Sequence, residues 1–167
     1  GVVVVVGFLA TACVRDPDPA AGPDVAPGQL VITELRGPQE GADDSGQFIE
    51  IYNGAGQALD LYGLELHTIR LDGSSRARIL IRDSLPVDHG GYVTLGPGAT
   101  FAQPAYVDYA MANDLSTNLY SSGAVFLYAF DEEIDRVVYS GLPTTGSRAL
   151  GELPPTAEGN DDEGAWC

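Results

Sequence analysis

The sequence predicts an all-β protein, a β-sandwich of about seven short strands. Apolar and polar residues alternate in short runs between Leu30 and Gly151, which is typical of strands buried on one side. Gly and Pro, 21 and 11 of the 167 residues, recur between these runs and favour turns over long helices. No stretch carries the apolar stripe of an amphipathic helix. The length indicates one domain, or one domain with appendages.

The strands are expected at Leu30–Arg36, Gln47–Asn53, Leu64–Leu71, Ala77–Arg82, Gly91–Leu95, Gly123–Phe130 and Glu133–Tyr139. The second segment alternates most clearly. Its Ile49 and Ile51 point to one side, and Phe48, Glu50 and Tyr52 point to the other.

In Leu64–Leu71 the alternation changes phase after Leu66, which predicts a β-bulge near Thr68. The fourth segment places Ile79 and Ile81 opposite its arginines. Both faces of Gly123–Phe130 carry large apolar residues, so this strand is expected to be central or covered by a loop.

A short acidic turn joins Gly123–Phe130 to Glu133–Tyr139 and predicts a hairpin. The segment Thr100–Leu119 shows no strand pattern. It is expected to hold a helical turn around Tyr109–Asn113 or to pack across one end of the sandwich.

The charge of the chain excludes one class of partner. The formal net charge is −16, and all 8 basic residues are arginine. A surface this acidic repels phosphate backbones, so binding to nucleic acid or to anionic membranes by charge is not expected.

Residues 1–12 are expected to be the truncated h-region of a secretory signal, because the uncharged run from Val2 to Ala12 is shorter than the roughly 20 residues of a membrane span. The small residues before Cys13 resemble a bacterial lipobox, although Ala10 stands where a large aliphatic residue is usual. We therefore expect export and lipidation of Cys13, with anchoring in the cell envelope at the outer membrane or cell surface. A plain signal peptide or a buried Val-rich strand are the alternatives.

Residues 13–29 are expected to form a lipidated, Pro- and Asp-rich linker that is disordered, and residues 30–167 to form the folded head. The chain stops at Cys167, a lone terminal cysteine that indicates a partner beyond a truncated end. Pairing of Cys167 with Cys13 is the competing interpretation.

Several motifs resemble the lamin tail domain family in its bacterial, exported form. Asp44–Asn53 resembles the strongest signature of the family, an aromatic–Ile–Glu–aliphatic–aromatic–Asn strand. Leu59–Leu66 resembles a second conserved segment, in which Leu64 replaces the usual Trp. Ile32–Leu35 matches the opening strand, and Leu119–Leu127 with Ile134–Val137 matches the late hairpin. The closing segment is matched by Ser147–Leu150, Asn160–Asp162 and Trp166–Cys167.

This resemblance implies an immunoglobulin-like sandwich that binds or targets rather than catalyses. It also points to a set of signature residues: Glu34, Phe48, Glu50, Tyr52, Asn53, Asp60, Gly63, Asp135 and Arg148. Glu50 is expected to accept hydrogen bonds or to pair with an arginine such as Arg148, and the alternative is that it binds a cation or ligand.

No catalytic or metal-binding motif is apparent. His67 and His89 stand apart, and no nucleophile or zinc signature is present. The acidic clusters Glu40–Asp44, Asp131–Asp135 and Glu158–Glu163 are expected to be solvated turns, with Ca²⁺ as the alternative ligand. We expect neither enzymatic activity nor a cofactor.

Two kinds of surface are candidates for contact. The aromatic residues could line a face that binds protein or carbohydrate, or could pack on the outside of the sheets: Tyr92, Tyr106, Tyr109, Tyr120, Phe126, Tyr128, Phe130 and Tyr139. The arginines at 70, 76, 78 and 82 are expected to pair with nearby acids.

Three functions are compatible with these expectations. The first is an envelope lipoprotein that mediates adhesion or assembly through an unknown protein or polysaccharide partner. The second is the non-catalytic targeting module of a larger secreted hydrolase or nuclease. The third is a Ca²⁺-dependent carbohydrate-binding module.

Overall fold

The computed structural model describes residues 22–41, 46–112, 114–115 and 119–167. The expected signal segment 1–12, the expected lipidation site Cys13 and residues 14–21 of the expected linker lie outside the described residues.

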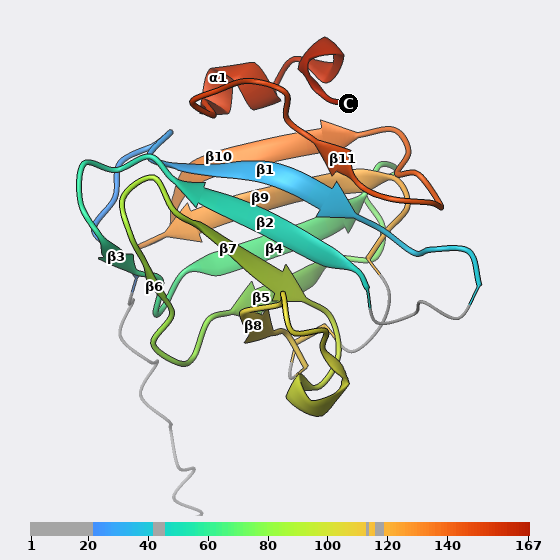
Figure 1. Ribbon diagram of the computed structural model, residues 1–167, viewed down its shortest axis with the longest axis horizontal. Coiled ribbons are helices and arrows are strands. Elements are labelled where there is room, and N and C mark those ends of the chain that lie inside the picture. The colour runs from blue at the N-terminus through green and yellow to red at the C-terminus, as the bar shows by residue number, and fades with distance from the viewer. Residues whose placement is uncertain (1–21, 42–45, 113, 116–118) are drawn as a thin grey trace, which may run out of the picture.

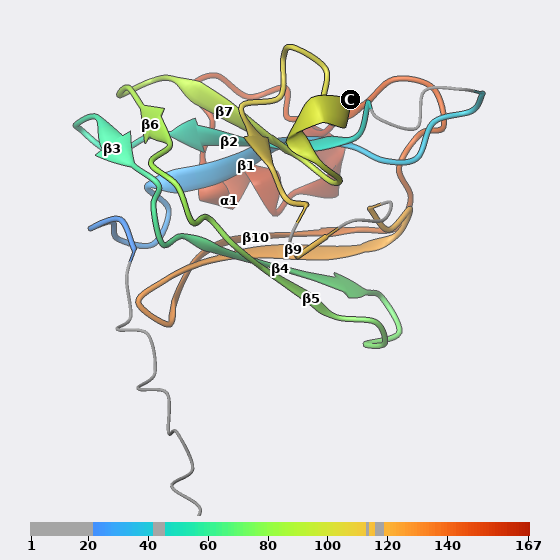
Figure 2. The same ribbon diagram turned by 90° about the horizontal axis from the view of Figure 1, so that it is seen from below.

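The described residues form a β-sandwich of two stacked sheets, with a two-stranded ribbon at one end (Figures 1 and 2). The five-stranded sheet has the order β11-β1-β2-β7-β8, the four-stranded sheet has the order β10-β9-β4-β5, and the ribbon pairs β3 with β6. The strands are β1 Leu30–Arg36, β2 Phe48–Asn53, β3 Leu59–Asp60, β4 Glu65–Arg70, β5 Ala77–Leu80, β6 Pro86–Val87, β7 Tyr92–Gly96, β8 Tyr109–Ala110, β9 Gly123–Ala129, β10 Glu132–Tyr139 and β11 Arg148–Ala149. The short helices are η1 Thr100–Ala102, α1 Ala157–Asn160 and η2 Glu163–Ala165.

The prediction of an all-β sandwich is confirmed, and each of the seven expected strands forms. The alternation places the core as expected. Ile49 and Ile51 of β2 are fully buried in the five-stranded sheet, and Leu66 of β4, Ile79 of β5 and Leu127 of β9 meet them from the four-stranded sheet. The hairpin of β9 and β10 also forms as predicted.

The bulge predicted near Thr68 is wrong. β4 pairs with β5 and with β9 in an unbroken register, so Thr68 follows Leu66 on the core side and is buried. A threonine has about the volume of a valine and fits the pleated surface of a sheet. Thr68 therefore takes a core position that the sequence pattern counts as polar, and the alternation only looks as if it changes phase there. The bulges lie instead in β1, at Thr33, and in β10, at Ile134.

The segment after β7 differs from the expected helical turn at Tyr109–Asn113. Tyr109 belongs to β8, which pairs with β7 in parallel. A single turn follows, in which the backbone N–H of Leu115 donates to the carbonyl of Met111 over 2.7 Å. Met111 and Leu115 are buried, so this segment closes one side of the core.

The folded head begins no later than Gly22, not at Leu30. Pro23 is buried, Val25 packs against the core, and the N–H of Gly28 donates to the carbonyl of Ile134 over 2.8 Å. The end of the Pro-rich linker therefore belongs to the sandwich, because its few apolar residues pack against the core and its backbone bonds to β10.

Both free edges of the four-stranded sheet are covered. On β10, helix α1 lies across the edge where β1 and β10 meet (Figure 1). On β5, the N–H of Leu80 donates to Asp114 over 2.8 Å, and the hydroxyl of Tyr109 donates to the carbonyl of Leu80 over 3.2 Å. The two contacts to Leu80 occupy its backbone N–H and carbonyl groups, which could otherwise pair with another strand.

Candidate functional site

Three of the signature residues hold turns at the ribbon end. Asn53 is fully buried, and its side-chain amide donates to the carbonyls of Gln57 and Val87 in the two neighbouring loops. Asp60 accepts hydrogen bonds from the Ser84 hydroxyl over 2.6 Å and from the N–H of Leu85 over 2.8 Å, which lower its pKa. Gly63 has a φ of 83°, which a side chain would strain. These residues shape the loops and do not meet in a site.

Asp135 and Arg148 hold the closing segment. The bulge at Ile134 turns the Asp135 carboxylate inward, where its Oδ2 accepts from the Ile32 N–H over 2.7 Å and from the Asn160 amide over 2.8 Å. Arg148 donates to the Glu163 carbonyl over 3.2 Å and lies 3.4 Å from its carboxylate. The expected pairing of Glu50 with Arg148 is therefore wrong.

The other signature residues meet on the outer face of the five-stranded sheet. Phe48 of β2 packs edge-on against Tyr106, with ring centroids 5.7 Å apart. Tyr52, on the same side of β2, lies 5.0 Å from Tyr92 of β7. We call Phe48, Tyr52, Tyr92 and Tyr106 the aromatic face. An outward face of a sheet is usually polar, so four aromatic rings there are unusual.

Glu50 lies between the two aromatic pairs. Thr33, the extra residue of the β1 bulge, donates its hydroxyl to Glu50 Oε1 over 2.7 Å. Burial raises the pKa of Glu50 above its ordinary value; the hydrogen bond from Thr33 opposes the rise, and repulsion from Glu34 and Asp108 adds to it. The expectation that Glu50 accepts a hydrogen bond is confirmed, and a cation beside it would favour its charged form.

A groove of about 230 Å³ runs beside this carboxylate. Glu34, Glu50 and Tyr92 line the groove together with Leu153, which is 84% exposed. The groove thus joins carboxylates, an aromatic ring and an exposed aliphatic side chain.

The remaining aromatic residues do not form one surface. Tyr139 is buried in the core, and Tyr109 covers β5. On the outer face of the four-stranded sheet, Tyr128 lies 4.7 Å from His67 and 6.3 Å from Phe126. This second face also carries the ion pair of Arg78 with Glu65, and Arg82 pairs with Asp114, so the expected pairing with acids is confirmed for these two of the four arginines.

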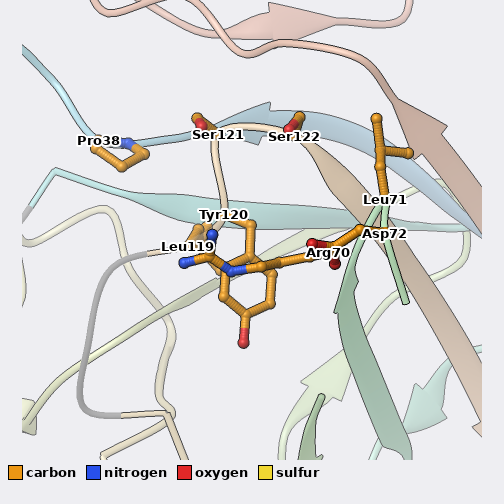
Figure 3. Close-up of a pocket in the computed structure, with 8 residues that line it drawn as sticks. All are labelled: Pro38, Arg70, Leu71, Asp72, Leu119, Tyr120, Ser121 and Ser122. Atoms are coloured by element: carbon orange, nitrogen blue, oxygen red, sulfur yellow. The ribbon is translucent and has the colours of Figure 1, made fainter. Parts of the chain in front are cut away.

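A separate pocket of about 560 Å³ opens at the end of the sandwich where β4 ends and β9 begins (Figure 3). Arg70 lies across the ring of Tyr120, with its guanidinium carbon 5.0 Å from the ring centroid. Asp72, Ser121 and Ser122 also line the pocket. Sequence analysis missed this pocket because Arg70 and Tyr120 are brought together only by the pairing of β4 with β9.

Neither histidine contacts a nucleophilic side chain among the described contacts. His67 Nε2 lies 3.2 Å from Glu65, and His89 contacts the carbonyl of Ala55. In the ranges that the structure describes, no group of three or more His, Cys, Asp or Glu side chains could hold a metal ion. The expected acidic cluster at Glu40–Asp44 is only partly within those ranges.

No family model matches the chain, and no curated protein matches it. Within the described part of the chain, none of the helices has the length and apolar character needed to span a membrane. The family resemblance therefore rests on the motifs of the sequence alone.

Proposed function

We propose that this protein is a non-enzymatic lipoprotein of the cell envelope, whose lamin-tail-like, immunoglobulin-like sandwich binds a protein or polysaccharide partner. The aromatic face is the binding surface. The lipid on Cys13 anchors the head, and the linker holds it away from the membrane.

The exposure of two rings of the aromatic face, Tyr92 and Tyr106, is the observation that carries this proposal; their partners Tyr52 and Phe48 are buried beneath them. Tyr92 is 44% exposed and Tyr106 is 50% exposed. Each ring packs against a second ring, so a partner that covers the pair would bury a large apolar area. Tyrosine rings supply large contact areas with a polar tip and are enriched where proteins bind partners. The groove beside Glu50 adds hydrogen-bond acceptors that fix the orientation of a partner.

Replacing Tyr92 with serine is expected to weaken binding of the head to envelope preparations from its source cells by about tenfold. The loss follows from removing one ring of the Tyr52–Tyr92 pair, without touching the core. Sedimentation of labelled protein with the envelope fraction measures the affinity.

Tyr62→Ser is the matched control, because Tyr62 is 52% exposed in the loop between β3 and β4 and belongs to neither ring pair of the aromatic face. Equal affinities for the two variants would contradict the assignment of the binding surface. Matching circular dichroism spectra and melting temperatures establish that both variants fold.

Replacing Cys13 with alanine is expected to move the protein from the membrane fraction to the soluble fraction. Several acyl chains together hold a protein on a membrane, and the variant lacks the sulfur that would carry them. Detergent phase partitioning of the full-length precursor, expressed in a bacterium, measures this.

Cys167→Ala serves as the control for the loss of a cysteine and is expected to stay in the membrane fraction. Cys167 is a free, exposed cysteine at the far end of the head. A Cys13→Ala protein that remains fully membrane-bound would overturn the anchor.

A further inference from the structure

We propose that the pocket between Arg70 and Tyr120 is a second binding site, which takes a neutral oligosaccharide. This inference does not rest on the aromatic face, since no residue of that face lines the pocket. Figure 3 shows the arrangement: the guanidinium of Arg70 lies over the Tyr120 ring, Asp72 lies next to Arg70, and Ser121 and Ser122 lie together at another edge of the pocket.

The pocket is built on fixed backbone. Arg70 is paired with Gly123 in the register of β4 with β9, where a side chain on Gly123 would collide with the backbone of Ile69. The carbonyl of Tyr120 accepts from the buried Tyr139 hydroxyl over 3.0 Å. The N–H of Leu119 donates to Gln47 over 2.8 Å. A ligand therefore meets walls that are already in place, which reduces the ordering cost of binding.

Arg70 supplies hydrogen-bond donors. Among the ion pairs of the described residues, none involves Arg70; its guanidinium is held by the Tyr120 ring. Stacking fixes the plane of the guanidinium but leaves its N–H groups available at the edge. These donors suit the oxygen atoms of a sugar.

Asp72 and the serines supply acceptors. The Oδ1 atom of Asp72 is occupied by the N–H of Ser74 over 2.8 Å and by its hydroxyl over 2.6 Å. These two bonds hold the carboxylate in the turn after β4, and both go to Oδ1, so they leave Oδ2 to face a ligand. The hydroxyls of Ser121 and Ser122 can both donate and accept. Donors and acceptors side by side match the adjacent hydroxyl groups of a pyranose.

The volume of the pocket and the net charge of the protein narrow the range of possible ligands further. A volume of about 560 Å³ falls in the range of sites for small organic ligands. Leu71, 53% exposed at the rim, offers an apolar contact for the C–H face of a sugar. The net charge of −16 opposes the approach of polyanions, so a neutral glycan is favoured over an acidic polysaccharide.

Titration of the full chain with a panel of neutral tetrasaccharides, built from glucose, mannose or N-acetylglucosamine, tests this proposal. We expect at least one to bind with a dissociation constant of about 1 mM or below, as for shallow polar sites. The amide signals that shift in NMR spectra should be those of residues 70–72 and 119–123. Arg70→Ala should weaken this binding roughly tenfold, since it removes charge-assisted hydrogen bonds.

Arg76→Ala is the matched control. Arg76 lies in the loop between β4 and β5, carries the same charge and does not line the pocket. Ser122→Ala is a second variant, which removes a hydroxyl from the pocket and leaves the Arg70–Tyr120 stack intact. It should also weaken binding of the sugar. The proposal is overturned if no tetrasaccharide shifts these signals, if Arg76→Ala weakens binding as much as Arg70→Ala, or if glucuronate binds more tightly than neutral sugars. Tyr92→Ser should leave sugar binding unchanged, so failure here and failure of the aromatic face are separate results.

Discussion

Replacing Asp135 with asparagine is expected to make the protein more stable at pH 8 than the wild type, with little change at pH 4. Asp135 is buried, and burial raises the pKa of its carboxyl from 3.8 to about 7, against the hydrogen bonds from Ile32 and Asn160. At pH 8 the folded wild type therefore carries a buried carboxylate, whereas asparagine at this position is neutral.

The sign of the effect follows from proton linkage. Between about pH 4 and pH 7 the folded protein holds a proton on Asp135 that the unfolded chain has released. The free energy of unfolding of the wild type therefore falls as pH rises through this window, by up to about 1.4 kcal/mol per pH unit, and levels off above it. The Asp135→Asn variant lacks this contribution and should gain about 2–4 kcal/mol over the wild type at pH 8.

The amide also suits its surroundings. Among the described residues, the Oδ1 atom of Asn160 is buried and has no hydrogen-bond partner, and an amide at position 135 adds N–H donors to the side chain that already contacts the Asn160 amide. Urea unfolding from pH 4 to pH 8 gives the difference between the two proteins. The fluorescence of Trp166, the sole tryptophan, follows the closing segment, because its ring N–H donates to the carbonyl of Asn160 over 2.9 Å.

Asp135→Ala separates the charge from the hydrogen bonds. At pH 5, where the wild-type carboxyl is largely neutral, alanine removes the acceptor for the Ile32 N–H and for the Asn160 amide. This variant should be about 2–3 kcal/mol less stable than the wild type at that pH. Parallel pH curves for Asp135→Asn and the wild type would contradict the raised pKa.

The sequence predicted the strands well because each strand has one side in the core. The alternation in β2 follows directly from the burial of Ile49 and Ile51, so the local sequence pattern is sufficient to predict this strand. The turn held by Asp60 could also be predicted, because its hydrogen bond to the N–H of Tyr62 two residues on is local.

Features that depend on two distant segments could not be predicted in the same way. The bulges at Thr33 and Ile134 depend on how β1 pairs with β2 and β10 pairs with β9, and they turn Glu34 outward and Asp135 inward. The partner of Arg148 was predicted wrongly because Glu163 approaches it only after the closing segment folds back on β1. The four residues of the aromatic face come from β2, from β7 and from the loop that carries Tyr106. The order of these segments in the chain does not show that their rings share one surface.

Replacing Asn53 with alanine is expected to lower the free energy of unfolding by about 3 kcal/mol, near 10 °C in melting temperature. The side chain is fully buried at the end of β2. Its Nδ2 donates to the carbonyls of Gln57 over 2.9 Å and Val87 over 3.1 Å, and its Oδ1 accepts from the N–H of Ala55 over 2.9 Å. Alanine leaves these buried backbone groups without partners and fills none of the space.

Two further variants make the test specific to this network. Asn53→Asp retains an acceptor for the Ala55 N–H but turns a negative charge toward the carbonyls of Gln57 and Val87, so it should be less stable than Asn53→Ala at pH 7. Gln57→Ala keeps the carbonyl and removes only an exposed side chain, so its stability should stay within about 0.5 kcal/mol of the wild type. Thermal unfolding followed by circular dichroism ranks the three. A loss below about 1 kcal/mol for Asn53→Ala would mean that the loops at the ribbon end are held by their backbone contacts rather than by this side chain.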